Sequence, residues 1–560
     1  MFKKFLGGKR MRKTNSMAVK RTEKEEFYIQ DKGITLITLV ITAIVLLILA
    51  GVSIGALNMG LIGKVQQGVE SYNKTANEEL NAVDSATGAL HSLISAGVNG
   101  NKIISDGSWN ATVNTPKLVT GMTAVYWAKD SSGDIDTVNP LNNTYEITQD
   151  DPNFKAKNWY NYVAQTGTTD GKTSRWANAK TADGSYWVWI PRYEYKIDYT
   201  GVEQGINKDQ TKAGTIDIKF ISTNTKVGTA GYTTDADGIT RSTDGYIIHP
   251  AFTNNVNAGG WDSEIPGIWV AKYEMSMEDN TGASVNIFGN TIENVAIGNV
   301  ATGNTLIANG ENDNGIKAVS KPGVTSWRFI NIANCYTNSY NYDRVKESHL
   351  MKRSEWGAVA YLTHSQYGRN GVEITLNSDK LYYTGGGNGD LYKTSTNQSS
   401  TGNISGVYDL SGGASEYAAV FNKKYSGTYF TDSSYLNTSG GTFASAGGDS
   451  TKYVTAYSNG TITYNATTLA NFTSTGDVSH IGDGIHEVWV NSIYGWFSDY
   501  CCFASSSSPF LQDGNSVSNS VYAGIFSSNK IDGSANRGSR FSCGAYSVKT
   551  KSMNFYCNNL

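Results

Sequence analysis

The longest apolar stretch of the chain lies near its N-terminus, where residues 33–63 contain no charged side chain. At about 1.5 Å rise per residue, a helix of this length is long enough to cross a bilayer. Ten Lys and Arg residues and four acidic residues precede the stretch. By the positive-inside rule this basic flank stays in the cytoplasm, so we expect a single membrane-spanning helix with the rest of the chain outside the cell.

Apolar residues then recur every three or four positions from Val65 to Leu93, which is the pattern of an amphipathic helix. Polar residues such as Asn73, Glu78 and Glu79 fall between them. The pattern therefore predicts a helical stalk, which ends in a glycine-containing loop near Gly97.

Downstream of the stalk the pattern changes to short apolar runs separated by Gly, Asn and Ser, which is typical of short strands and turns. Residues 186–193 (YWVWIPRY) predict a strand that stops at Pro191, and residues 268–274 (IWVAKYE) predict another. Three segments are poor in large apolar residues and are interpreted as surface insertions, at about 200–245, 279–316 and 420–480.

Composition agrees with a loop-rich extracellular domain, because the chain of 560 residues contains 60 Gly and 34 Tyr but only 8 Pro. The formal net charge is −3, and the basic leader is explained by topology, so no nucleic-acid partner is expected. Five cysteines argue against a disulfide framework, although a bridge from Cys501 or Cys502 to Cys543 or Cys557 stays open.

The run KGITLI at residues 32–37 resembles a type IV prepilin signal. The resemblance implies cleavage after Gly33 by a prepilin peptidase and N-methylation of Ile34. Pilins usually carry glutamate at the fifth mature position, where this chain has Thr38, so no carboxylate is available to neutralise a buried terminal amine. Assembly with pilins is therefore in question, and an uncleaved signal anchor is the alternative.

Other segments resemble the formylglycine-generating enzyme (sulfatase-modifying factor) family. Residues 349–361 (HLMKRSEWGAVAY) are similar to a helix motif of that family, and residues 406–417 (GVYDLSGGASEY) to its turn-and-strand motif. The resemblance implies a C-type-lectin-like fold of the α+β class, with small antiparallel sheets, two helices and long irregular insertions. The family's activity needs a C-terminal cysteine pair, and residues 512–515 (QDGN) stand where its motif would fall, so we do not expect an enzyme.

Several residues of these motifs are expected to be structural. Trp189, Trp269, Trp356 and Tyr417 are predicted core aromatics. The acids Glu355 and Glu416 are expected to tie loops through hydrogen bonds, as the resemblance implies, and Asp409 to cap backbone amides.

The C-terminal segment 494–547 alternates apparent scaffold with Ser, Asn, Tyr, Cys, Asp and Arg. This palette resembles the variable proteins of diversity-generating retroelements, in which template adenines are replaced by any base. Tyr, Ser and Asn also form adaptable contact surfaces in antibody loops. The resemblance implies a ligand-binding face made of Tyr494, Ser498, Asp499, Tyr500, Cys501, Cys502, Ser506, Ser507, Asn515, Ser516, Ser518, Asn519, Tyr522, Ser528, Asn536 and Arg537. The alternative is an ordinary polar loop region of low complexity.

These observations predict a cell-surface protein, anchored in the membrane or on a pilus, that binds a protein or glycan on another surface. The alternatives are a minor pilin or pseudopilin with a structural role, and an oxidase on the same fold. No cofactor is expected apart from a structural calcium ion, for which the Asp- and Asn-rich loops offer oxygen ligands without fixing a position. The expected parts are a leader (1–33), a membrane-spanning pilin-like helix (34–63), a stalk (64–97), a head (98–547) and a tail (548–560).

Overall fold

The chain divides into two units, Met1–Asn101 and Lys102–Leu560, and every described residue belongs to the second. The computed structural model describes residues 114–165, 173–202, 209–234, 239–279, 281–285, 316–328, 330, 332–343, 346–423, 449–458, 462–464, 472–474, 480–491, 493–517, 522–531, 540–541 and 546–547. The predicted leader, membrane helix, stalk and tail lie outside these ranges. Within them, no helix has the length and apolar character needed to cross a membrane.

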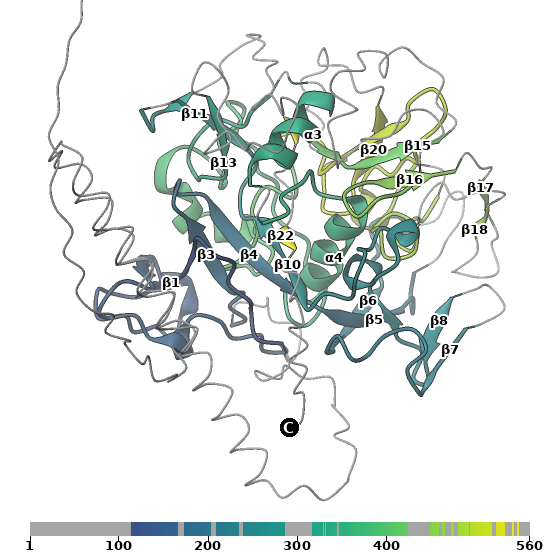
Figure 1. The fold of residues 1–560 in the computed structure, drawn as a ribbon, viewed down its shortest axis with the longest axis horizontal. Helices are drawn as coiled ribbons and strands as arrows, with labels where there is room; N and C mark the ends of the chain where they lie inside the picture. Colours follow the sequence, from purple (N-terminus) through teal and green to yellow (C-terminus); the bar gives the residue numbers. More distant parts are fainter. Residues whose placement is uncertain are drawn as a thin grey trace, which may run out of the picture. The chain divides into compact units, whose positions relative to one another are not determined.

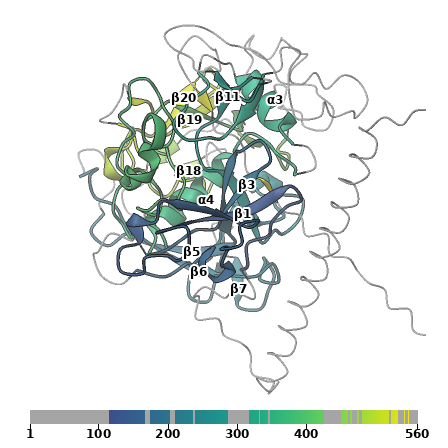
Figure 2. The same cartoon turned by 90° about the vertical axis from the view of Figure 1, so that its left-hand side faces the viewer.

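An antiparallel sheet forms the centre of the second unit, with strand order β2-β1-β3-β4-β10-β22. Its strands are β1 (Met122–Ala128), β2 (Tyr145–Thr148), β3 (Asn178–Thr181), β4 (Tyr186–Pro191), β10 (Gly267–Ala271) and β22 (Tyr546–Ser547). The run YWVWIP is buried on both faces of β4, and Trp189 lies opposite Trp269 of β10. The pairing of β1 with β3 can be followed in Figures 1 and 2.

Smaller sheets surround this centre. One has the order β6-β5-β9, one β12-β11-β13, one β20-β19-β14-β21, and three are pairs, β7 with β8, β15 with β16 and β17 with β18. The bounds are β5 (Tyr193–Asp198), β6 (Thr215–Phe220), β7 (Tyr232–Thr234), β8 (Thr240–Ser242), β9 (Ile247–Ile248), β11 (Ser276–Glu278), β12 (Ser284–Val285), β13 (Lys317–Val319), β14 (Glu416–Ala418), β15 (Val420–Asn422), β16 (Thr455–Tyr457), β17 (Ile462–Tyr464), β18 (Phe472–Ser474), β19 (Phe510–Asp513), β20 (Ser528–Ile531) and β21 (Arg540–Phe541). Of these strand pairs, β14 with β21 and β15 with β16 are parallel.

Two α-helices are present among the described residues, α3 (Ile332–Asn341) and α4 (Arg353–His364). Helix α4 is buried along its whole length and contacts β4 and β6 (Figure 1). Glu355 caps its first turn, because the Lys352 amide donates to Glu355 Oε2 at 2.9 Å. Gly357 allows the close approach of a loop, since a Cβ there would lie 2.0 Å from the carbonyl oxygen of Gly482.

A buried lysine follows β10 and joins three segments. The ammonium of Lys272 donates to Asn178 Oδ1 at 2.8 Å, to the Ile404 carbonyl at 2.5 Å and to the Gly406 carbonyl at 2.7 Å. The same nitrogen lies 4.7 Å from the centre of the Trp127 ring. Lys272 therefore ties β3 and the end of β10 to the segment around residue 405.

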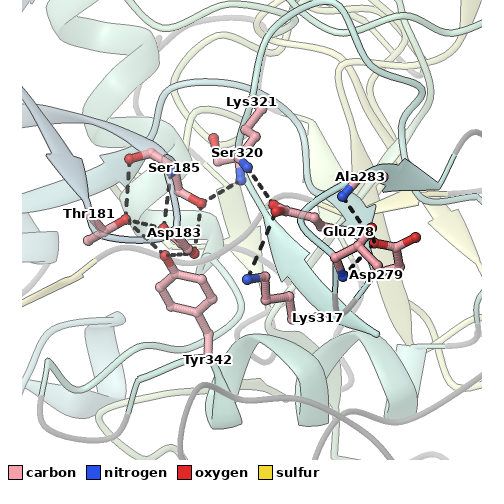
Figure 3. Close-up of polar contacts among 11 residues, drawn as sticks. Thr181, Asp183, Ser185, Glu278, Asp279, Ala283, Lys317, Ser320, Lys321 and Tyr342 are labelled. Carbon is pink, nitrogen blue, oxygen red and sulfur yellow. Dashed lines mark hydrogen bonds and ion pairs between the residues drawn. The ribbon is translucent and has the colours of Figure 1, made fainter. Parts of the chain in front are cut away.

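A polar cluster fastens the turn between β3 and β4 (Figure 3). The carboxylate of Asp183 accepts from the Ser185 amide at 3.0 Å and from the Tyr342 hydroxyl at 2.7 Å. Ser185 Oγ in turn accepts from the Ser320 amide at 3.0 Å, and nearby Glu278 pairs with two lysines. Both acids are engaged by their neighbours, so we interpret the cluster as structural.

The prediction of small antiparallel sheets and two helices is confirmed for the described residues, which are mostly β with some α. Strand β4 ends at Pro191 as predicted, and α4 begins within the predicted helix motif of residues 349–361 and continues to His364. The four predicted core aromatics are buried, namely Trp189, Trp269, Trp356 and Tyr417. Asp409 accepts from the backbone amides of Gly385 and Gly386 as expected of a cap, and Glu416 is buried on β14.

Two predicted surface insertions are wrong in part. Residues 215–220 form strand β6, in which Ile216, Ile218 and Phe220 are buried. The polar residues between them hid this period-2 alternation within a Thr- and Asp-rich context. The predicted insertion at 420–480 likewise contains the buried strands β15 (residues 420–422) and β16 (residues 455–457), so these parts of it are not surface loop.

Candidate functional site

A buried aromatic layer lies beneath the segment that the sequence marks as variable. Trp496 and Phe526 are both fully buried, with ring centres 5.5 Å apart. The His364 ring at the end of α4 packs on both, at 5.2 Å from Trp496 and 5.8 Å from Phe526. The Trp356 indole of the same helix donates to the Ile525 carbonyl at 2.7 Å. Helix α4 therefore supports the loops that carry the predicted ligand contacts.

The three tyrosines among the predicted contact residues lie close together. The rings of Tyr494 and Tyr522 are stacked with centres 5.8 Å apart, and Tyr500 lies 6.2 Å from Tyr522. Backbone bonds hold them together, since the Tyr500 amide donates to the Tyr522 carbonyl at 3.0 Å and Tyr494 pairs with Tyr500 in a β-bridge. We call Ile493, Tyr494, Tyr500, Cys502 and Tyr522 the tyrosine face.

The tyrosine face presents apolar rings and neutral polar groups together. Tyr522 is 39 % exposed and Ile493 is 38 % exposed, whereas Tyr494, Tyr500 and Cys502 are half-buried. A hydrogen bond to the Cys502 side chain, together with burial, raises the pKa of Tyr500 to about 12. A hydrogen bond to Tyr522 likewise raises the pKa of Tyr494. These hydroxyls therefore stay protonated at neutral pH and remain available as donors and acceptors.

Small polar residues flank the face in sequence. Ser506 and Ser507 are exposed at the tip of a tight turn closed by bonds between Ser505 and Ser508. Ser498 and Ser516 are half-buried. These four predicted contact residues have side chains that solvent reaches, as a ligand-binding role requires.

The structure buries four other predicted contact residues, namely Asp499, Cys501, Asn515 and Ser528. Their side chains lie beneath the surface, so in this structure they hold the loops rather than meet a ligand. Residue type alone could not separate them from the exposed positions, because the same small polar residues serve both purposes.

Asp499 illustrates this supporting role. Its Oδ2 accepts from the Phe526 amide at 2.9 Å, while burial raises the pKa of its carboxyl well above the ordinary value. A Cβ at Gly524 would lie 1.9 Å from Asp499 Oδ1, so this close approach requires glycine. The contact fixes the segment 524–526 against the turn that precedes Tyr500.

A buried ion pair joins helix α4 to strand β19. The Arg353 guanidinium of α4 lies 3.1 Å from Asp513 Oδ1 of β19, and both side chains are buried. Burial raises the pKa of Asp513 to about 6, against the opposing effect of Arg353. Burial also raises the pKa of the Cys501 thiol well above its ordinary value, so this sulfur is not a ready nucleophile.

Three non-glycine residues near the face adopt the left-handed backbone region. Phe497 has φ 60°, Ser498 φ 66° and Asn515 φ 54°. Asparagine accepts this conformation readily, whereas a phenylalanine or serine there costs about 1–2 kcal/mol. The Ser498 amide donates to the Gln210 carbonyl at 2.9 Å, which helps to hold the strained turn.

Several predicted site residues lie outside the described ranges, namely Gly33, Ile34, Ser518, Asn519, Asn536 and Arg537. In the described part of the chain, no group of three or more His, Cys, Asp or Glu residues is placed to hold a metal ion, and Cys335, Cys501 and Cys502 are free thiols. No calcium ligands are therefore assigned. Ile493 was missed by the sequence analysis because isoleucine is not part of the variable palette.

No protein-family model matches the chain, and a comparison with curated proteins likewise finds no match.

Proposed function

We propose that this chain is a ligand-binding protein displayed on the cell surface, and that the tyrosine face contacts its ligand. One observation carries the proposal: the rings of Tyr494 and Tyr500, from the turn at 493–501, meet the ring of Tyr522 from a separate segment, and Tyr522 is exposed at the surface. Rigid amphipathic tyrosines give large contact area at low entropic cost, which is why they recur in recognition surfaces. The ligand class is a protein or glycan on another surface.

The finer part of this proposal is a C-type-lectin-like head of the formylglycine-generating-enzyme type, diversified at its C-terminal segment by a retroelement. It is supported by the helix motif, which forms α4 with its Glu355 cap, and by the position of Asp409 at the Gly385–Gly386 turn. The apolar stretch 34–63 after its basic flank supports a membrane anchor with the head outside the cell.

A binding comparison tests the role of the tyrosine face. The full chain, solubilised in detergent, is applied to arrays of purified surface proteins and glycans, and the affinity for any hit is measured. A variant carrying Tyr494→Ser, Tyr500→Ser and Tyr522→Ser is compared with Tyr145→Ser, a control tyrosine on β2 that is 53 % exposed. We expect the triple variant to lose at least about tenfold in affinity, or 1.4 kcal/mol, and the control to lose none.

Equal binding by the wild-type chain and the triple variant would refute the assignment of the face. If no ligand binds and deletion of the head abolishes filament assembly, the structural alternative of a minor pilin takes its place. Thermal unfolding of each variant shows whether a loss of binding reflects a loss of folding.

A further inference from the structure

A cavity of about 200 Å³ lies between β5, β8, β9 and the loop at residues 481–487. Strand β9 pairs with β5 and contacts β8, so one side of the cavity is formed by neighbouring strands. Half-buried apolar side chains form its walls, namely Ile197, Ile247 and Ile481. None of the residues of the tyrosine face lines this cavity, so it is a separate feature of the molecule.

A buried carboxylate supplies the first polar group of the cavity. Glu487 Oε2 accepts from the Tyr361 hydroxyl at 2.7 Å and from the Gly482 amide at 2.8 Å, and the Tyr195 hydroxyl lies 2.8 Å from both carboxylate oxygens. Each carboxylate oxygen offers about two acceptor positions. Oε2 is therefore fully engaged, whereas Oε1 keeps a position for a donor, and its orientation is fixed in advance.

A tyrosine and an arginine supply the other polar groups. Tyr199 lines the cavity with its ring edge-on to Trp496, 6.3 Å between ring centres. Burial raises the pKa of Tyr199 well above its ordinary value, with a further contribution from the charge of Glu487, so its hydroxyl stays protonated. Arg241 of β8 also lines the cavity and adds donors. Lys196 and His486 line the cavity as well, so polar groups share the lining with the three isoleucines.

The size of the cavity limits what it can hold. An apolar cavity of roughly 150 Å³ takes a benzene molecule, so a cavity of about 200 Å³ has room for one six-membered ring with its substituents. The ring needs apolar C–H surface for the isoleucines and the tyrosine, and edge groups that both donate and accept hydrogen bonds. Hydroxyl groups on a saturated ring have this property, since each can donate to Glu487 or accept from Arg241.

We propose that this cavity binds a single pyranose residue, with one sugar hydroxyl donating to Glu487, another bonded to the Tyr199 hydroxyl, and the C–H groups of the sugar ring against the isoleucine walls. The site is independent of the tyrosine face, and either can exist without the other. A free monosaccharide and the terminal residue of a glycan present the same chemistry to it.

Saturation-transfer NMR on the full chain tests the proposal, in a detergent that contains no sugar. The probes are methyl glycosides of a hexose, an N-acetylhexosamine and a hexuronate, with free amino acids as the opposing class of small polar ligand. We expect at least one glycoside to bind, Tyr199→Phe to weaken it up to about tenfold, and Ile481→Trp to abolish binding by filling the cavity. Tyr494→Ser on the tyrosine face is the matched control and should leave glycoside binding unchanged.

Glycoside binding that Ile481→Trp or Tyr199→Phe reduces supports the proposal, provided that the variant unfolds at the same temperature as the wild type. Tyr199→Phe removes one hydroxyl, so it keeps the test decisive if Ile481→Trp does not fold. The proposal would be overturned if no glycoside gave a signal or if only amino acids bound. It would also be overturned if Tyr494→Ser lost glycoside binding while the cavity variants kept it. Comparing the affinity for the methyl glycoside with that for an oligosaccharide ending in the same sugar shows whether the cavity takes a free monosaccharide or the terminal residue of a glycan.

Discussion

Replacement of Lys272 by methionine removes the ammonium that joins β3, the end of β10 and the segment around residue 405. Methionine has a similar length and fills much of the same volume, so packing changes little. The change leaves three acceptors without their donor, namely Asn178 Oδ1 and the carbonyl oxygens of Ile404 and Gly406. It therefore isolates the polar contribution of one buried side chain.

The size of the effect follows from the burial of these groups. Lys272 is fully buried, and Asn178 is 1 % exposed, so the freed acceptors have little access to solvent. A buried acceptor left unsatisfied costs about 1–3 kcal/mol. The variant no longer has to bury a charged ammonium, and this gain offsets part of the total cost of leaving three acceptors unsatisfied. The groups left behind are neutral oxygen acceptors, so we expect a net loss of about 1–3 kcal/mol in the free energy of unfolding, which is the range for a buried acceptor without its donor.

Urea unfolding of the full chain, followed by the fluorescence of its 12 tryptophans, measures this loss. Lys180→Met is the matched control, because Lys180 pairs with Glu146 at 3.0 Å but remains 32 % exposed. An exposed pair of this kind contributes about 0–1 kcal/mol. If Lys272→Met costs no more than Lys180→Met, the argument that the buried lysine ties three segments together is refuted.

Two further predictions concern pH and backbone packing. Burial raises the pKa of Asp409 from 3.8 to about 6, so its contribution to stability is full below pH 3.8 and is lost as pH rises through 6. Asp409→Asn should therefore remove up to about 3 kcal/mol of the stability loss between pH 3.8 and 6, seen as a flatter plot of unfolding free energy against pH. An unchanged slope would contradict the raised pKa of Asp409. Gly524→Ala should destabilise by about 1–3 kcal/mol, because its Cβ would overlap Asp499, whereas Gly495→Ala, with its nearest neighbour at 3.3 Å, should cost less. Equal unfolding temperatures for the two glycine variants would count against the close contact.

Local patterns predicted the parts of the fold that depend on neighbouring residues. The apolar run of β4 and its end at Pro191 follow from β-propensity and from the missing amide of proline. The motif that became α4 carried Glu355 in its first turn, where a carboxylate can cap backbone amides. Strand β6 was missed because its alternation of Ile and Phe lies in a polar context.

Contacts between distant segments could not be predicted in the same way. The burial of Cys501 beside the half-buried Cys502 depends on how the turn at 493–501 folds against residue 528. The cavity brings together Tyr199, Arg241 and Glu487, which are far apart in the chain and share no motif. Exposure and cavity shape are properties of the tertiary structure, and a single sequence specifies them only through the whole set of packing interactions.

Deep sequencing of the gene's 3′ end in a population of the source strain tests the tyrosine face most directly, because it needs no knowledge of the ligand. We expect substitutions concentrated in codons for exposed or half-buried positions such as Tyr494, Tyr500 and Tyr522, at adenines of a nearby near-copy. We expect none in the codons for the buried Trp496 and Phe526. A uniform 3′ end with no near-copy, or substitutions spread equally over buried and exposed codons, would contradict a diversified binding face.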